Sequence, residues 1–162
     1  PYTTLFRSHN GNWGFLYDAV SDAIELAPVY DCGSCLYPQA DDEIMRSVLT
    51  NQGDRDYRIY EIPTSAITLE GKKIRYFDFI SSLREEGCSR ALRRIVPRID
   101  MGKIGKLIYD TPFLSDLQRQ FYLTMLAERK AKILDFALEK LEQAKDGLLP
   151  VKHKAGKDRD AR

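Results

Sequence analysis

The sequence is poor in the residue types that mark several specialised classes of protein. It has three cysteines in 162 residues, too few for a disulfide framework, and this low count suits a reducing compartment such as the cytoplasm. Its 25 Lys and Arg residues balance 24 Asp and Glu residues, so a net charge of +1 gives no overall attraction to nucleic acid. No apolar run approaches the ~18 residues of a membrane-spanning helix. We therefore expect neither a membrane protein nor direct nucleic-acid binding.

The 43% of hydrophobic residues suffices for a core, and the length suggests one domain. We expect that domain to span residues 9–148. One back-translation of residues 1–8 (PYTTLFRS) resembles the end of a common short-read sequencing adapter, so we interpret them as a non-native scar. The natural protein would then extend upstream. Residues 149–162 are basic and almost free of apolar side chains, which predicts a disordered tail.

A β-hairpin is predicted over residues 13–30. Residues 13–18 (WGFLYD) are aromatic and apolar, which is typical of a short buried strand. A turn over 19–22 leads to a return strand over 23–30, whose end Pro28 confines to a sheet edge. Because a two-stranded hairpin is marginal alone, we expect more sheet or helices to cover it.

The rest of the chain is predicted to be mainly helical, so the fold class is mainly α with a small hairpin. Asp41 or Asp42 should cap a helix through Thr50, before a polar connector over 51–56. Residues 70–73 look like a turn, and the pattern is helical from Tyr76 onward. A last helix should run from an N-cap at Ser115 to about Lys145. The shared apolar faces are Leu92/Ile95/Val96, Ile104/Leu107/Ile108, and Leu117/Phe121/Met125/Ile133/Ala137/Leu141.

Two oxygen-bearing side chains are predicted to meet at the open end of the hairpin. If the turn centres near residue 21, cross-strand partners sum to about 42, so Asn12 faces Tyr30 and Asp31 is its diagonal neighbour. An amide oxygen and a carboxylate suit magnesium, which completes its shell with phosphate and water. Protein kinases hold the metals that bridge the ATP phosphates with such a pair.

The motifs around these residues resemble those of the HipA-like serine/threonine kinases, known from bacterial toxin–antitoxin modules. The chain has His9-x-x-Asn12 and then LAPVYDCGS over residues 26–34, close to the catalytic and metal loops of that family. The resemblance covers residues 9 to about 145 and implies the helical C-terminal lobe of a kinase-like fold, truncated at its N-terminus. It implies ATP and magnesium as cofactors, Asn12 and Asp31 as metal ligands, and His9 as a loop-shaping or electrostatic residue. It further implies a protein substrate and an antitoxin-type partner.

Two departures from the family pattern bear on activity. The catalytic Asp of the family should lie five residues before Asn12, where Arg7 stands, and Cys32 replaces a common aromatic residue. The phosphate-covering N-terminal lobe is not in this sequence either. We therefore expect a kinase in the natural protein and an inactive fragment here.

Other functions stay open from the residues alone. Phosphatidylinositol 3/4-kinase-like enzymes share the Asn and Asp-x-Gly pattern, and a non-catalytic helical module or pseudokinase would explain Arg7. Cys32-x-x-Cys35 lacks a second ligand pair for zinc and the helix that follows a redox pair, so we expect thiols without a metal or redox role. The basic stretch over 84–106 is interpreted as a solvated helix face, with a docking face for an acidic partner or nucleic acid as the alternative.

Overall fold

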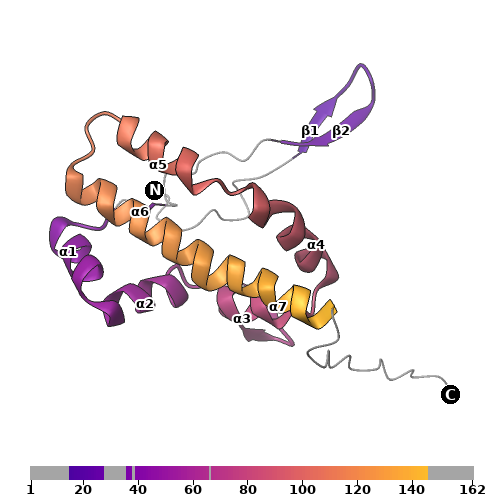
Figure 1. Ribbon diagram of the computed structural model, residues 1–162. Helices are drawn as coiled ribbons and strands as arrows, with labels where there is room; N and C mark the ends of the chain where they lie inside the picture. Colours follow the sequence, from indigo (N-terminus) through magenta and orange to yellow (C-terminus); the bar gives the residue numbers. More distant parts are fainter. Residues whose placement is uncertain (1–14, 28–35, 38, 66, 146–162) are drawn as a thin grey trace.

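A computed structural model describes residues 15–27, 36–37, 39–65 and 67–145 (Figure 1). A hairpin at one end of the molecule leads into a helical body. The elements in chain order are β1 (Phe15–Asp18), β2 (Ala23–Leu26), α1 (Asp42–Thr50), α2 (Gln52–Tyr60), β3 (Thr68–Leu69), β4 (Lys72–Lys73), α3 (Tyr76–Ser82), α4 (Glu86–Ile95), η2 (Val96–Arg98), α5 (Met101–Asp110), α6 (Asp116–Arg129), η3 (Lys130–Asp135) and α7 (Phe136–Lys145).

The helical body is built around one long helix made of α6, η3 and α7 (Figure 1). It begins where predicted, at Ser115, whose hydroxyl accepts from the Gln118 amide (3.2 Å) while the Gln118 side chain accepts from the Ser115 amide (2.8 Å). The middle segment, η3, is a π-helix, which the sequence analysis did not foresee. Its wider turn lets Lys130 reach Asp135 five residues on, with N–O distances of 2.7 and 2.9 Å.

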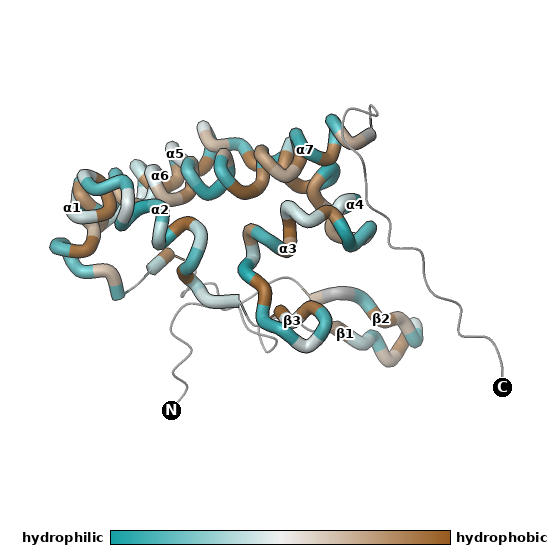
Figure 2. Tube along the Cα trace, turned by 90° about the horizontal axis from the view of Figure 1, so that it is seen from below, coloured by the Kyte–Doolittle hydropathy of each residue, from teal (hydrophilic) through white to brown (hydrophobic). Residues whose placement is uncertain are grey.

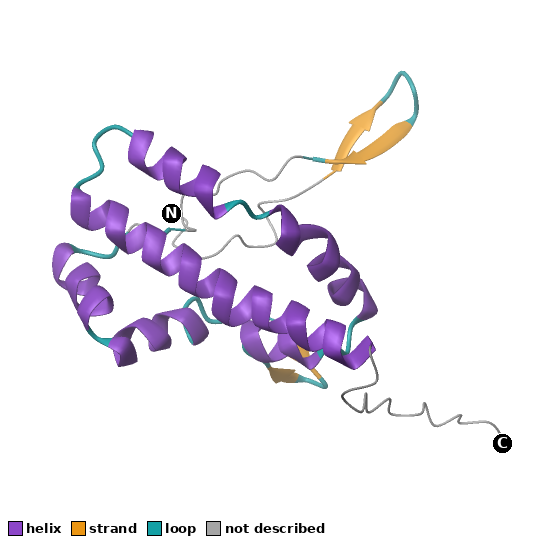
Figure 3. Ribbon diagram, viewed as in Figure 1, coloured by secondary structure: helices purple, strands orange, loops and turns teal. Residues whose placement is uncertain are grey.

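Two layers of helices cover this central helix. Helices α1, α2 and α3 lie along one side and α4 and α5 along the other (Figure 3), each in contact with α6, η3 or α7. Two apolar clusters result. One is centred on Tyr37, Met45, Val48, Ile59, Phe121, Met125 and Ile133, and the other on Leu92, Val96, Ala137 and Leu141. Figure 2 shows the apolar stretches of the flanking helices interleaved with polar ones, as expected for amphipathic helices over a shared core.

The predicted connector over 51–56 is wrong, because helix α2 starts there. Asn51 ends α1 and at once caps α2, its side-chain oxygen accepting from the amides of Gly53 (2.8 Å) and Asp54 (3.2 Å). One Asn thus makes a corner between two helices without a loop. The first helix itself matches its prediction, with Asp41 accepting from the Ile44 amide at 2.8 Å.

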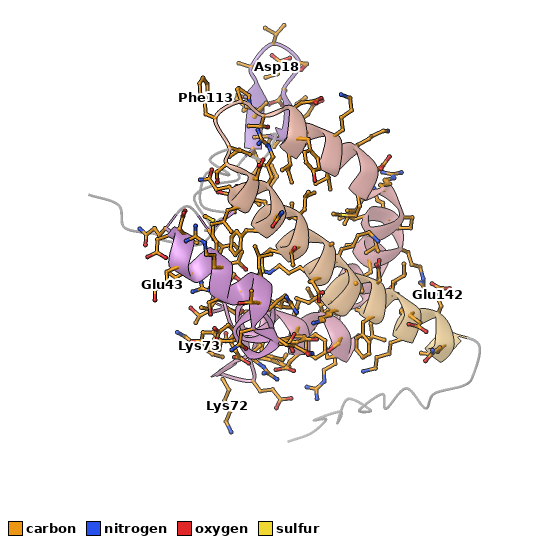
Figure 4. All side chains as sticks on the ribbon, turned by 60° about the vertical axis from the view of Figure 1, so that its left-hand side comes forward. Asp18, Glu43, Lys72, Lys73, Phe113 and Glu142 are labelled. Carbon is orange, nitrogen blue, oxygen red and sulfur yellow. The ribbon has the colours of Figure 1, made fainter. Side chains whose placement is uncertain are left out.

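The predicted turn over 70–73 is confirmed in part. Glu70 and Gly71 take positive φ angles of 52° and 78° between β3 and β4, but Lys72 and Lys73 belong to the second strand. Figure 4 shows the Lys72 side chain extending away from the body.

The apolar faces predicted for the middle helices are only partly buried. Leu92, Val96 and Ile108 lie in the interior, whereas Ile95 and Leu107 are more than half exposed. Ile95 and Leu107 each precede a buried residue in the sequence and lie at the edge of the narrow apolar stripe of their helix. Within the described part of the chain, no helix combines the length and apolar character needed to cross a membrane.

Candidate functional site

The hairpin that leads to the candidate site is present, one residue out of the expected register. β1 and β2 pair from Phe15–Leu26 to Asp18–Ala23, so partners sum to 41 rather than 42. The turn over residues 19–22 causes the shift, because its centre falls between residues 20 and 21. Asp18 organises this turn, its carboxylate accepting from the Val20 amide (2.9 Å) and the Ser21 hydroxyl (2.5 Å). The Ser21 bond, and then the Val20 bond, lower the pKa of Asp18.

The expectation that the first strand is buried is wrong. Phe15, Tyr17 and Ile24 on one face of the hairpin are each more than 60% exposed, and Leu16 on the other face is 57% exposed. The hairpin stands out from the helical body (Figure 1), so none of the described helices covers it. An apolar strand pattern therefore identified the strand correctly but not its burial.

The residues predicted to carry the chemistry lie outside the described part of the chain. These are His9, Asn12 and Asp31, together with Arg7, Cys32, Cys35 and the tail over 149–162. Within the residues that the structure does describe, no group of three His, Cys, Asp or Glu side chains could hold a metal ion. The donor set of Asn12 and Asp31, one amide and one carboxylate oxygen, fits magnesium by its chemistry.

Tyr37 anchors the chain just after the segment that contains Asp31. Its ring is buried and meets Phe121 edge-on, with 5.9 Å between the ring centroids. Its hydroxyl lies 3.1 Å from the carbonyl oxygen of Arg58 and 3.3 Å from that of Ile62, at the end of α2. Burial raises the pKa of Tyr37, so the phenol stays neutral and can donate.

Arg129 completes this anchor from the central helix. Its guanidinium carbon lies 5.2 Å from the centroid of the Tyr37 ring, and Nη2 donates to the same carbonyls, of Arg58 (3.2 Å) and Ile62. Burial lowers the pKa of Arg129, and among the described residues no carboxylate pairs with it. We name Tyr37, Arg129 and the two carbonyls the Tyr37–Arg129 anchor.

Sequence reasoning missed this anchor, although one signal was present. The apolar stripe of the last helix repeats every four residues, and Arg129 occupies the place between Met125 and Ile133. A cation at a core position of an otherwise apolar stripe marks a buried polar contact.

The basic stretch over 84–106 forms an exposed surface, as interpreted from the sequence. All seven of its Lys and Arg side chains are exposed. Four of them pair with carboxylates within the described chain, for example Arg93 with Glu142 at 3.3 Å. Cys88, a free half-buried thiol, lies on α4 within this stretch. Burial raises the pKa of Cys88, which disfavours the reactive thiolate.

Comparison with known proteins relates the chain to a bacterial kinase. No family model matches. The serine/threonine-protein kinase CtkA of Helicobacter pylori (strain J99) is 50% identical over 133 residues, which are 82% of this chain and 41% of CtkA. The crystal structure of the H. pylori proinflammatory kinase CtkA superposes with a TM-score of 0.80 at 47% identity, over 86% of this chain and 51% of that one.

The chain therefore spans about half the length of the relative it matches or less, and over that span it has the same fold. The predicted fold class, mainly helical with a small antiparallel hairpin, is confirmed. In addition to the predicted hairpin, β3 and β4 form a second two-stranded sheet.

Proposed function

We propose that this chain is part of a HipA-like serine/threonine protein kinase, which transfers the γ-phosphoryl group of ATP to a protein hydroxyl. The observation that carries the proposal is the 50% identity to CtkA over 133 residues, with a matching fold at a TM-score of 0.80. The motif over residues 26–34 independently points to the same chemistry.

Asn12 and Asp31 are the proposed ligands of the magnesium that accompanies ATP. They stand in the two segments that flank the β1–β2 hairpin in the sequence, Asn12 three residues before β1 and Asp31 five residues after β2. One amide oxygen and one carboxylate oxygen are hard donors of the kind that magnesium takes from proteins, and this chemistry supports the proposal.

The protein's own part in the reaction is positioning. Asn12 and Asp31 would hold magnesium, which would supply positive charge to the ATP phosphates, and phosphoryl transfer would depend mainly on alignment and electrostatics. Asp31 would supply a charged oxygen and Asn12 a neutral one, while His9 would shape the catalytic loop that carries Asn12 or add to its electrostatics. The Tyr37–Arg129 anchor holds the chain downstream of Asp31 to α2 and α6. The residue that orients the substrate hydroxyl belongs at the position of Arg7.

The resemblance to the same family also supports a proposed substrate, partner and cellular location. The substrate is a protein, and the resemblance to toxin kinases implies an antitoxin-type partner. A cytoplasmic location suits an ATP-dependent enzyme with few cysteines.

A chimaeric kinase tests the proposal directly. Residues 9–145 of this chain replace the matching segment of CtkA, and phosphorylation of dephosphorylated casein is measured with and without magnesium. We expect magnesium-dependent activity, which Asp31→Asn lowers by about 100-fold or more because a charged metal ligand is lost. Glu139→Gln, a change of the same kind at an exposed site on α7, should leave activity unchanged. A chimaera that folds but is inactive, or that Asp31→Asn leaves fully active, would contradict the proposal.

A second chimaera addresses Arg7 and the non-catalytic alternative. It carries residues 1–145, so that Arg7 replaces the residue of CtkA at that position. We expect this chimaera to be inactive while the shorter one is active, because the substrate-orienting carboxylate is absent. Equal activity of the two would show that position 7 does not hold the catalytic base.

A further inference from the structure

A groove between α2 and α3 has no role in the proposed reaction. It is lined by Asp56, Tyr57, Tyr60, Glu61, Arg75 and Phe77 and has a volume of about 480 Å³. We name it the α2–α3 groove. Its volume falls in the range of sites that take one side chain or a small ligand.

Aromatic rings form one part of its wall. Tyr60 and Phe77 meet edge-on with 5.0 Å between centroids, and Phe77 lies 5.7 Å from Phe136 at the start of α7. Tyr57 is 58% exposed beside them. Such rings offer their negatively polarised faces to a cation, which is the usual ligand of a site that combines aromatic rings with carboxylates.

Two ion clusters border the groove, and each carries one excess negative charge. In the first, Lys132 lies 2.7 Å from both Asp56 and Glu128. In the second, Arg75 lies 2.5 Å from Glu61 and 2.6 Å from Asp78. Each cluster has two carboxylates for one cation, and one carboxylate of each, Asp56 or Glu61, lines the groove.

The hydrogen bond from Lys132 lowers the pKa of Asp56, so this carboxylate is ionised at neutral pH. The charge of Arg55 also reaches Asp56 and lowers its pKa, although the guanidinium itself donates to the carbonyls of Val48 (3.1 Å) and Leu49 (3.0 Å). Arg58 lines a different groove beside α1. The excess negative charge at the groove therefore lies mainly on the second cluster, where Glu61 and Asp78 share Arg75. The α2–α3 groove is therefore complementary to an ammonium or guanidinium group.

We propose that the α2–α3 groove docks the basic tail of the same chain, residues 151–162. That segment contains five Lys and Arg residues and two Asp residues, an excess of three positive charges. Phe136 places the groove at the start of α7, about 15 Å from the end of that helix at Lys145. Residues 146–150, if extended, span about 17 Å, so they can return the tail to the groove.

The expected strength favours a tethered occupant over a free peptide. A cation on aromatic rings together with an exposed ion pair gives a dissociation constant of about 6–200 mM, too weak to capture a dilute partner. A tether of about five residues gives an effective concentration in the millimolar range, so the docked state is populated in part. Chemical shifts averaged over docked and free chains report such a partial population.

The test compares NMR spectra of the full 162-residue chain and of a chain that ends at Lys145. We expect chemical-shift differences at residues 56–61 and 75–77 in 50 mM salt, and their loss in 1 M NaCl. Tyr57→Ser in the full chain should reduce these differences by about threefold or more, because a ring face is removed. Tyr109→Ser, the same change at an equally exposed site on α5, should leave them unchanged.

Three results would overturn the proposal. They are spectra that agree at the groove residues in low salt, differences that persist in 1 M NaCl, and differences that grow with protein concentration. The last would assign the groove to a second copy of the chain. Reversal of the tail charge by Lys152→Glu with Lys154→Glu, which leaves the folded body untouched, should reproduce the spectrum of the shortened chain.

Discussion

The hairpin and the helical body use similar apolar residues in opposite ways. In the body, Phe121 and Ala137 are completely buried, whereas Phe15 and Tyr17 of the hairpin are more than 60% exposed. The difference lies in what surrounds them. The central helix has neighbours on both sides, but nothing among the described elements covers the hairpin. Residue type alone therefore does not decide which segment belongs to the core.

This contrast has an energetic consequence. A two-stranded ribbon without cover contributes little stability of its own, while the body buries two apolar clusters along one helix. We expect the hairpin to open locally at low cost and the body to unfold as one unit. Substitutions in the body should therefore lower the free energy of unfolding more than substitutions in the hairpin.

The largest effect is expected from Phe121→Ala. Phe121 lies at the centre of the first cluster with no exposed surface, so its loss removes a large apolar side chain and leaves a cavity. We expect the free energy of unfolding to fall by about 3–5 kcal/mol, measured by urea denaturation. Phe15→Ala in the hairpin is the matched control and should cost less than about 1 kcal/mol. Similar losses for the two variants would break the contrast between the regions.

A second, smaller effect is expected at the Tyr37–Arg129 anchor. Arg129→Ala leaves the carbonyls of Arg58 and Ile62 without this donor in a mostly buried place, at an expected cost of about 2 kcal/mol. Tyr37→Phe keeps the ring under the guanidinium and should cost about 1 kcal/mol. Both losses are measured as shifts of the urea midpoint. If Arg129→Ala left the free energy of unfolding unchanged, the cost of burying the guanidinium charge would equal the stabilisation that its contacts provide.

The central helix shows what sequence patterns could predict in this protein. Its start at Ser115 and its buried stripe were predictable, because a capping box and a repeating apolar face are local signals. The π-helical segment was not predicted, although the stripe indicates it in retrospect. A strict repeat of four residues drifts by about 40° per step on an α-helix, and the wider turn of η3 reduces that drift.

The predictions that failed concern features that leave no local signal in the sequence. Asn51 looked like part of a loop, because one residue that ends a helix and caps the next leaves no loop signal. The predicted hairpin register was wrong by one residue, because the register depends on where the turn hydrogen bonds of Asp18 form. Of the candidate site, the sequence indicated the ligand types at 12 and 31, but the downstream anchor depends on tertiary contacts between Tyr37, α2 and α6.

A third prediction concerns an ion pair that joins α2 to the central helix. The hydrogen bond from Lys132 lowers the pKa of Asp56, so the pair adds stability above the unfolded pKa of about 4 and loses it as pH falls through the lower folded pKa. Asp56→Asn should cost about 0.5 kcal/mol at pH 7. The difference between the two proteins should shrink between about pH 5 and pH 3, in urea denaturation at several pH values. A constant difference would contradict the lowered pKa.

The smallest effect is expected in the hairpin, from Ile24→Ser. Ile24 lies opposite Tyr17 and is 67% exposed, so serine there loses little buried apolar surface and only a modest strand preference. We expect the free energy of unfolding to change by no more than about 0.5 kcal/mol in the 162-residue chain. In the CtkA chimaera the same change should cost more if the added half of the kinase covers this face. An equal, small cost in both proteins would show that the hairpin stays exposed in the longer kinase, and a large cost in this chain alone would show that the body already covers it.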